Sequence, residues 1–480
     1  MGKQEINYTK GIYLHSICEC IIKNHSAIKE RKASWIIELE HKINIANKAS
    51  KGFWGVTSSD SLFVTYAQSL IQLLNSNASL NDIRDLQKRI EANSRNKIAV
   101  LFLTQEAICW PSIENIYQAA QDDERFDTTL VYTPFYHGNS TSAYDNYEVY
   151  KEMGLQVLKH DEYNLAVESP DIVVILKPYD SCVPAQYRTP ELEIVVERLV
   201  FISYGMETNM DFVDYNYRMY LQYRAWKIIA YGDIVKQIGT KYGYANGENI
   251  AVWGHPRADS YLDMASKRDI IPQEWNDVIK GRSTILWTPH HMVDLSENGT
   301  GTWLLWKDTM LSAILSHPEI VFIWRPHPLM MGAIVNNGLM SKKELDSFIY
   351  ELTSHENIIY DTNPDYRTSF YASDAIITDA TSFCVEYLYT ENPILLTPRN
   401  MNALYMHEEM NDCYYVAHSS SEIREFIKMV SDKGDPLRQK RLELKQAMFH
   451  IPSGVTTSQN ILNNIFSELT KEEMKIIDEV

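Results

Sequence analysis

Short apolar runs without polar interruption alternate with helix-like segments from Lys97 onward. Two clear examples are Ile98–Leu103 and Ile320–Trp324. Runs of this kind are typical of strands that are buried on both faces of a sheet. Because strands separated by helices form βαβ units, the alternation predicts parallel sheets covered by helices. The expected fold class is therefore α/β.

The strands fall into two series along the 480 residues, a length too great for one ordinary core. The first series is expected at Ile98–Leu103, Thr129–Tyr132, Ile172–Leu176, Glu193–Phe201 and Trp226–Tyr231. The second is expected at Ile250–Trp253, Thr284–Trp287, Ile320–Trp324, Ala375–Ile377 and Pro393–Leu396. We predict two Rossmann-like, doubly wound domains that face each other across a cleft, over residues 96–248 and 249–480. The second domain is expected to include closing helices.

Residues 1–95 have a helical spacing of apolar positions instead. Helices are expected near Ser34–Ala49, Ser58–Leu74 and Leu80–Ala92, each beginning close to a residue that can cap it. We therefore predict an N-terminal helical extension that provides a packing or partner surface.

The chain has a formal net charge of −18, with 45 Lys and Arg against 63 Asp and Glu. This balance argues against nucleic-acid binding, which needs a basic field. No segment approaches the roughly 20 apolar residues of a spanning helix, and the N-terminus lacks an apolar signal region. We expect a soluble, cytoplasmic protein whose six cysteines are reduced and mostly buried. Peripheral association with the inner face of the plasma membrane and the oligomeric state stay open.

Four short motifs each follow a predicted strand of the second series. They are Gly254–Asp259, Thr288–His291, Arg325–Pro328 and Thr378–Phe383. The motifs concentrate His, Arg and small hydroxyl residues at strand ends, where open α/β sheets bind ligands. This pattern suits an anionic ligand, most simply one that carries phosphate.

Two of these motifs point to phosphate chemistry through particular side chains. Arg325 offers a planar fork for phosphate, and His327 can donate or accept a proton, while the two neighbouring prolines stiffen their turn. Thr381 and Ser382 open a helix beside Asp379, where hydroxyls and unpaired N–H groups bind phosphate. An ordinary helix N-cap explains that motif equally well.

The other two motifs divide into functional and structural residues. His290 and His291 are adjacent and expected to point in different directions, so one of them serves as a phosphate donor or general acid, and no metal site is predicted. In the Gly254–Asp259 motif, Arg257 is interpreted as functional, and His255 and Asp259 as structural. The tryptophans that precede three of the motifs, Trp253, Trp287 and Trp324, are expected to pack in the core.

In this order the four motifs resemble the CDP-glycerol glycerophosphotransferase family, which includes teichoic-acid primases and polymerases. The family pattern is Gly-x-Pro-Arg-x-Asp, then Thr-Pro, Arg-x-His-Pro and Thr-Asp-x-Ser-Ser, and the match is close from Ile250 to Leu396. The resemblance implies a GT-B fold that holds the nucleotide in its C-terminal domain and the acceptor in its N-terminal domain. By motif, the donor phosphates would meet Arg325, His327, Thr381, Ser382 and Arg257.

One family motif is altered in this chain. Family members often have Trp-His-Gly in the N-terminal domain, and the histidine of this motif looks like the base that activates the acceptor. This chain has Ser203-Tyr204-Gly205 instead. Glu207, His137 and Glu106 are the other bases available in the N-terminal half. The sequence does not decide among them.

The resemblance implies a transferase that moves glycerol phosphate, or a similar polyol phosphate, from a CDP-linked donor to a hydroxyl of a glycan or lipid-linked polymer, releasing CMP. Teichoic-acid or capsule biosynthesis in a bacterial cell envelope is the implied setting. No cofactor or metal is expected. The catalytic candidates are His327, Arg325, Glu207 and His137, and the donor-binding candidates are Arg257, His290, His291, Asp379, Thr381 and Ser382. A GT-B glycosyltransferase that uses a nucleotide-sugar, or a non-catalytic nucleotide-binding subunit of an assembly complex, stays open.

Overall fold

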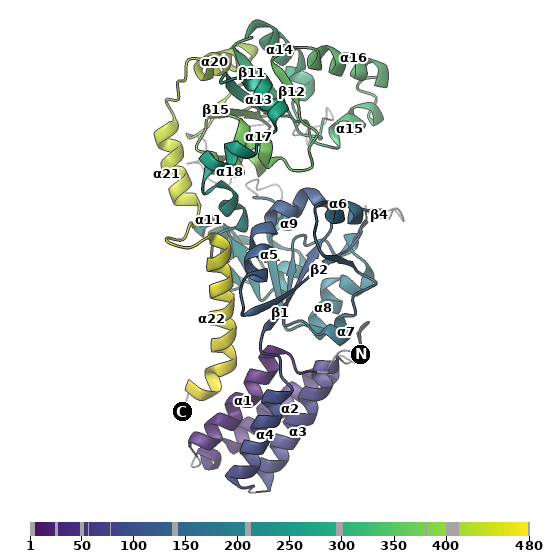
Figure 1. The fold of residues 1–480 in the computed structure, drawn as a ribbon, viewed down its shortest axis with the longest axis vertical. Coiled ribbons are helices and arrows are strands. Elements are labelled where there is room, and N and C mark those ends of the chain that lie inside the picture. Colours follow the sequence, from purple (N-terminus) through teal and green to yellow (C-terminus); the bar gives the residue numbers. More distant parts are fainter. Residues whose placement is uncertain are drawn as a thin grey trace.

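The computed structural model of the protein describes residues 5–24, 27–48, 52–55, 57–76, 78–136, 143–206, 213–293, 301–379, 382–399 and 412–478. A helical bundle and two parallel-sheet domains follow one another along the long axis of the molecule (Figure 1). The predicted architecture, two doubly wound domains with an N-terminal helical region, is confirmed.

The first sheet has seven parallel strands. Across the sheet they are β5 (Val157–Lys159), β2 (Phe126–Tyr132), β1 (Ile98–Thr104), β6 (Ile172–Ile175), β7 (Arg198–Ile202), β8 (Lys227–Ala230) and β9 (Ile250–Val252). From β1 the chain builds outward through β2 and β5, then returns to β6 and builds the other way. The strand order therefore reverses between β1 and β6, which makes this position the topological switch point of the sheet.

The second sheet has six parallel strands and the same kind of order. Across the sheet they are β12 (Ile358–Tyr360), β11 (Ile320–Trp324), β10 (Ser283–Thr288), β13 (Ala375–Thr378), β14 (Ile394–Leu396) and β15 (Tyr415–Val416). Its switch point lies between β10 and β13. A separate antiparallel pair, β3 (Phe135–Tyr136) and β4 (Ala143–Tyr144), completes the described strands.

Helices cover the sheets and form the bundle. In the bundle and the first domain they are α1 (Tyr8–Lys23), α2 (Ala27–Lys48), α3 (Ser58–Asn75), α4 (Leu80–Ala92), α5 (Glu114–Gln121), α6 (Tyr147–Glu152), α7 (Leu165–Glu168), α8 (Thr189–Val195), α9 (Val213–Tyr217), α10 (Tyr220–Arg224) and α11 (Asp233–Tyr242). The later helices are α12 (Met264–Lys267), α13 (Gln273–Ile279), α14 (Trp303–Ser316), α15 (Met330–Asn336), α16 (Lys342–Thr353), α17 (Arg367–Ala372), α18 (Ser382–Glu386), α20 (Ser420–Ser431), α21 (Arg438–Met448) and α22 (Thr457–Asp478). No helix in these described ranges has both the length and the apolar character to span a bilayer.

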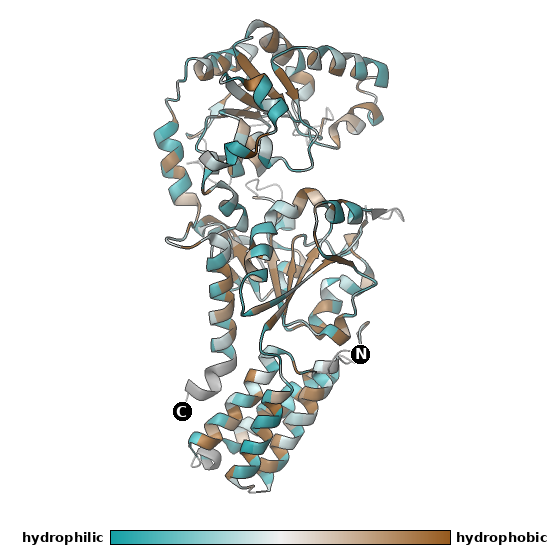
Figure 2. Ribbon diagram, viewed as in Figure 1, coloured by the Kyte–Doolittle hydropathy of each residue, from teal (hydrophilic) through white to brown (hydrophobic). Residues whose placement is uncertain are grey.

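The apolar strands are buried on both faces, as their composition predicts. In β1, Ile98 and Val100 belong to one core cluster, and Leu101 and Leu103 belong to another. The second of these clusters also contains Leu286 of β10, so an apolar core continues from one domain into the other. The strands of both domains are brown in the hydropathy colouring, whereas the bundle helices alternate brown and teal (Figure 2).

One strand belongs to the other sheet from the one expected. Ile250–Trp253 is wrong as the opening strand of the second series, because β9 pairs with β8 at the edge of the first sheet. Helix α22 also returns to the first domain, where Ile461 and Leu462 are buried against its core. The first of the four motifs is therefore attached to the first sheet.

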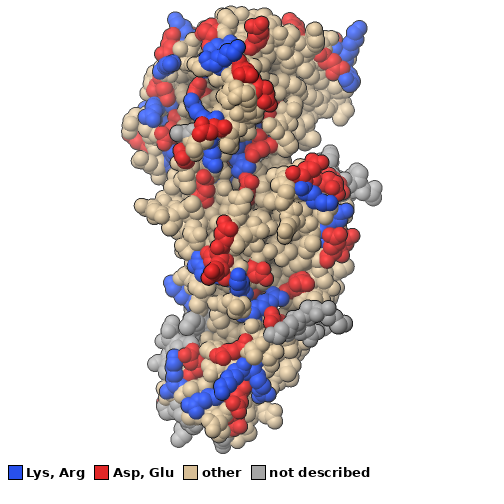
Figure 3. Space-filling view, in the orientation of Figure 1, with Lys and Arg blue, Asp and Glu red and all other residues tan. Residues whose placement is uncertain are grey.

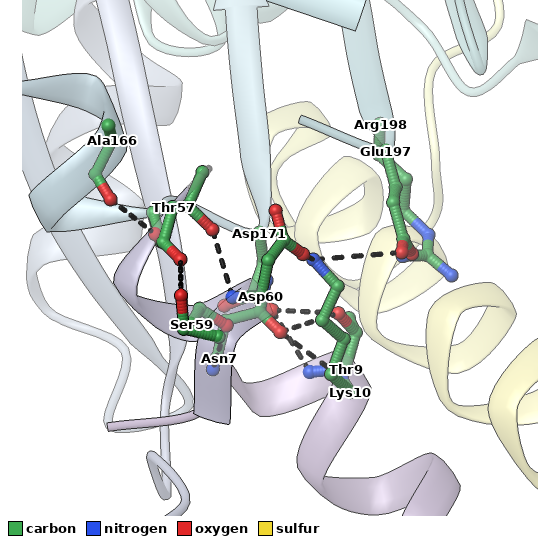
Figure 4. A network of polar contacts seen from close by, with 12 residues as sticks. Asn7, Thr9, Lys10, Thr57, Ser59, Asp60, Ala166, Asp171, Glu197 and Arg198 are labelled. Carbon is green, nitrogen blue, oxygen red and sulfur yellow. Dashed lines mark hydrogen bonds and ion pairs between the residues drawn. The ribbon is translucent and has the colours of Figure 1, made fainter. Parts of the chain in front are cut away.

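A buried polar network ties the helical bundle to the amino ends of the first sheet (Figure 4). The carboxylate of Asp171, just before β6, accepts hydrogen bonds from the backbone N–H of Thr9 (3.0 Å), the hydroxyl of Thr9 (3.0 Å) and the backbone N–H of Ala99 (2.9 Å). Lys10 forms an ion pair with Asp60 of α3 (2.6 Å). The bundle thus lies at the end of the sheet opposite to the carboxyl ends of its strands.

Candidate functional site

The carboxyl ends of β10, β11 and β13 bring three of the four motifs together at the switch point of the second sheet. Thr288 ends β10 and Thr378 ends β13, and the two residues are paired in register. The backbone N–H of His327, just after β11, donates to the carbonyl of Pro289, just after β10 (3.0 Å). Ligands of open α/β sheets bind outside such a switch point.

Three histidine rings gather at this point. The ring centroids lie 4.2 Å apart for His290 and His291, 4.2 Å for His291 and His327, and 5.3 Å for His290 and His327. The expectation that the adjacent histidines diverge is therefore wrong. One ring nitrogen from each lies within 4.8 Å of the others, a spacing that would also admit a metal ion.

Hydrogen bonds assign the protons of two rings. The backbone N–H of Leu329 donates to Nδ1 of His327 (3.2 Å), and that of Met292 donates to Nδ1 of His290 (3.4 Å). Because Nδ1 accepts, a neutral ring carries its proton on Nε2. An N–H group repels a metal ion and attracts an anion, so this donor set fits phosphate oxygens better than a cation.

The three rings are neutral at physiological pH. Burial lowers the pKa of His290 to about 3 and that of His327 to about 4, and the neighbouring histidines act in the same direction. Burial also lowers the pKa of His291, whose buried Nδ1 has no hydrogen-bond partner among the described residues. An unsatisfied buried polar atom costs free energy, so a ligand that pairs with it is stabilised.

Asp379 lies beneath this cluster rather than in it. Its carboxylate accepts hydrogen bonds from the backbone N–H groups of His290 (2.7 Å) and Thr302 (3.2 Å) and from the hydroxyls of Thr302 and Thr397. It is 1% exposed, and burial raises its pKa to about 6. Asp379 therefore holds the His290 loop in place through these hydrogen bonds.

Arg325 is buried beside the cluster and already paired. Its Nη1 forms an ion pair with Asp361 (2.7 Å), and its Nη2 donates to the carbonyl of Asn363 (2.7 Å). Only 7% of the residue is exposed. The guanidinium thus carries positive charge near the site from a fixed position, at the end of β11.

Arg257 lies between the two domains. It forms a buried ion pair with Glu386 of α18, while Nε and Nη2 donate to the hydroxyl of Ser112 (3.0 and 2.8 Å) and Nη2 also donates to the carbonyl of Tyr204 (2.6 Å). Ser112 and Tyr204 follow β1 and β7 of the first sheet. The carboxyl ends of both sheets therefore face each other around this residue, and the space-filling surface is indented between the two domains (Figure 3).

The neighbouring motif residues are structural, as their sequence context predicts. Nε2 of His255 donates to the carbonyl of Ser203 (2.9 Å). Asp259 accepts hydrogen bonds from the backbone N–H groups of Thr457 (2.6 Å) and Ser458 (2.8 Å), so it caps the distant helix α22. Gly254 has a φ of +90°, and a Cβ there would lie 2.6 Å from the carbonyl of His450. The close approach at Gly254 is therefore made by this chain, not by a ligand.

Other candidates are less fully placed. Ser382 is the first residue of α18, and it is partly buried. Thr381, Glu207 and His137 lie outside the described residues. Trp253, Trp287 and Trp324 are buried, which confirms their interpretation as core residues.

The first sheet has an ionic pair at its own switch point. Glu106 follows β1, Lys177 follows β6, and the two side chains form an ion pair. Burial lowers the pKa of Lys177 to about 8, and the neighbouring Cys182 acts in the opposite direction. Glu106 was considered as a base from the sequence, but Lys177 was missed. Lys177 directly follows an apolar strand, and polar residues in that position were the signal that identified the candidate site of the second sheet.

The chain matches one family model. The family described as CDP-Glycerol:Poly(glycerophosphate) glycerophosphotransferase matches residues 205–467, more than half of the chain. This range includes the histidine cluster, Arg325 and Asp379. A comparison with curated proteins found no match.

Several solved structures share the fold. S. aureus MnaA in its UDP co-structure covers 78% of this chain and 97% of its own, with 13% identity and a TM-score of 0.54. UDP-GlcNAc 2-epimerase from Neisseria meningitidis bound to UDP-GlcNAc covers 77% and 100%, with 12% identity and a TM-score of 0.53. A variant of the wall teichoic acid polymerase TagF soaked with CDPG covers 85% and 99%, with 14% identity and a TM-score of 0.51. The chain is therefore a transferase of GT-B fold that belongs to the CDP-glycerol:poly(glycerophosphate) glycerophosphotransferase family.

Proposed function

We propose that the protein transfers glycerol phosphate, or a closely related polyol phosphate, from a CDP-linked donor to a hydroxyl of a glycan or lipid-linked polymer of the bacterial cell envelope. CMP is the other product. The family match supports the donor class. The observation that carries the proposal is the convergence of His290, His291 and His327 at the switch point of the second sheet.

In this proposal the second domain binds the donor, and the Nε2–H groups of His290 and His327 donate to its pyrophosphate oxygens. The acceptor oxygen attacks the phosphorus that carries the polyol, and the bond from that phosphorus to the CMP oxygen breaks. Fixed N–H donors and the nearby charge of Arg325 stabilise the negative charge that develops on the phosphoryl oxygens. Asp379 acts indirectly, by holding the His290 loop. Direct phosphate contacts from Thr381 and Ser382 remain predictions.

The test is a product analysis. The purified protein is incubated with CDP-glycerol, CDP-ribitol and a panel of nucleotide-sugars, each with a short oligo(glycerol phosphate) acceptor. CMP release together with a longer oligomer supports the proposal. Release of a nucleoside diphosphate without CMP would show sugar transfer instead, and tight binding of cytidine nucleotides without turnover would show a binding subunit. The same assay with teichoic-acid and capsule precursors on vesicles examines the acceptor and the membrane association.

A further inference from the structure

The first sheet has a second candidate site that mirrors the position of the histidine cluster. Glu106 and Lys177 lie at the carboxyl ends of β1 and β6, the two strands between which the order of the first sheet reverses. They are 71 residues apart in the chain, so only the sheet brings them together. By the rule that locates the donor site, this switch point is also where a ligand binds.

The pair lines a pocket of mixed character. The side chain of Lys177 is 8% exposed and that of Glu106 is 28% exposed, so the carboxylate is the partner that can reach a ligand. The Lys177 ammonium also lies over the rings of Phe135 (4.4 Å) and Tyr204 (5.0 Å). Hydroxyl groups of Thr133 and Tyr179 line the same pocket. Polar groups above an aromatic wall suit a polyol or sugar.

Tyr204 is one described residue that connects the pocket to the second domain. Tyr204 places its ring against Lys177, and its hydroxyl lies 3.2 Å from that of Tyr179. Its carbonyl accepts the hydrogen bond from Arg257, which in turn is paired with Glu386 of the second domain. Tyr204 is also the residue that stands where the family pattern has its histidine. Tyr204 thus contacts both Lys177 and Arg257, so the pocket lies next to the residue that joins the two domains.

Packing alone does not call for this ion pair. Burying a lysine and a carboxylate together costs desolvation free energy, and an apolar pair of similar volume is often at least as stable. The strands that lead to Glu106 and Lys177 are continuous apolar runs, and the charges begin only where the strands end. A buried charged pair confined to a switch point is more simply explained by chemistry at that point.

We propose that Glu106 is the general base that takes the proton from the attacking hydroxyl of the acceptor. The proposal rests on the function proposed above. As the acceptor oxygen forms its bond to phosphorus, its proton passes to the Glu106 carboxylate, and the bond to the CMP oxygen breaks. Lys177 pairs with the carboxylate and orients it, and is a positioning residue.

The test separates donor binding from transfer. Three variants are compared with the wild type: Glu106→Gln, Glu106→Asp and Glu472→Gln. Calorimetry measures the affinity for CDP-glycerol. Transfer is measured as CMP release with saturating CDP-glycerol and an oligo(glycerol phosphate) acceptor. Glu472 is the matched control, because it contacts the buried Arg198 (3.4 Å) at the amino end of the same sheet. Loss of a general base lowers rates by roughly 10²–10⁴-fold.

We expect Glu106→Gln to bind CDP-glycerol within twofold of the wild type and to transfer about 10²-fold more slowly or worse. Glu106→Asp should recover at least tenfold of that loss, and Glu472→Gln should match the wild type. Transfer by Glu106→Gln at the wild-type rate overturns the inference. So does an equal loss in both Glu106 variants that is accompanied by loss of CDP-glycerol binding. If the wild type itself releases no CMP, the proposed function fails instead.

Discussion

Arg257 and Glu386 form a buried ion pair that joins the two α/β domains. The partners are 5% and 0% exposed, and they are 129 residues apart in the chain. Glu386 also accepts hydrogen bonds from the hydroxyls of Tyr261 (2.7 Å) and Tyr366 (2.6 Å). Since the charged partners are enclosed, the pair helps to set how the two α/β domains sit against each other.

Removing one charge of this pair should destabilise the protein. Glu386→Gln leaves the Arg257 guanidinium buried without a counter-charge, so we expect a loss of about 3–5 kcal/mol in the free energy of unfolding. Urea denaturation followed by tryptophan fluorescence measures it. The control is Glu391→Gln, whose partners Lys445 and Arg438 lie at the surface, and it should cost under about 1 kcal/mol. Equal losses in the two variants would contradict the assigned role.

The histidine N–H groups are proposed to donate hydrogen bonds to phosphate oxygens. Removing one of these groups should therefore weaken the binding of ligands that carry phosphate, and of those ligands alone. His327→Phe keeps a ring in the cluster but removes its N–H group, and a hydrogen bond to a charged group is worth about 1.5–3 kcal/mol. We expect CDP to bind roughly 10–100-fold more weakly by calorimetry, and cytidine, which lacks phosphate, to bind equally well. His317→Phe, at an exposed ion pair with Glu319, should change neither affinity. A parallel loss for cytidine would indicate a general disturbance of the domain.

Asp379 should make the stability depend on pH in a defined window. Its folded pKa of about 6 lies above the unfolded value of about 3.9. Between these values the folded state holds more protons, so this group's contribution to stability falls as the pH rises, and it is constant above about pH 7. We expect the unfolding free energy of the wild type, minus that of Asp379→Asn, to fall by on the order of 2 kcal/mol from pH 4 to pH 6. A difference that rises with pH over this range would show a lowered pKa instead.

The polar network around Asp171 predicts how the helical bundle is held against the first sheet (Figure 4). Asp171→Ala leaves the N–H groups of Thr9 and Ala99 without their acceptor, at a cost of about 1–3 kcal/mol for each buried group. We expect faster proteolytic cleavage between the bundle and β1 and a lower midpoint of thermal unfolding. Asp127→Ala, at an exposed position in the same domain, is the control. Unchanged cleavage would mean that the apolar contacts of the bundle are sufficient.

Local sequence patterns were sufficient to predict most of the helices and strands. The apolar runs at Ile98–Leu103 and Ile320–Trp324 are strands because no other local structure buries such a run on both faces within so few residues. The helix at Leu80–Ala92 begins after Ser79, a residue that can cap it, and in the structure Ser79 and Asp82 form a capping box. The strand Ile358–Tyr360 at the edge of the second sheet was missed.

The sequence by itself determined the α/β class, the order of the motifs and the residue types of the candidate site, because these depend on neighbours along the chain. Only the tertiary structure decided that Ile250–Val252 completes the first sheet. It also decided that Arg257 forms an ion pair with Glu386 and that Lys177 forms one with Glu106. Each of these is a pairing between segments distant in sequence. The free energy of such a pair depends on burial and geometry, which exist only once both sheets have formed.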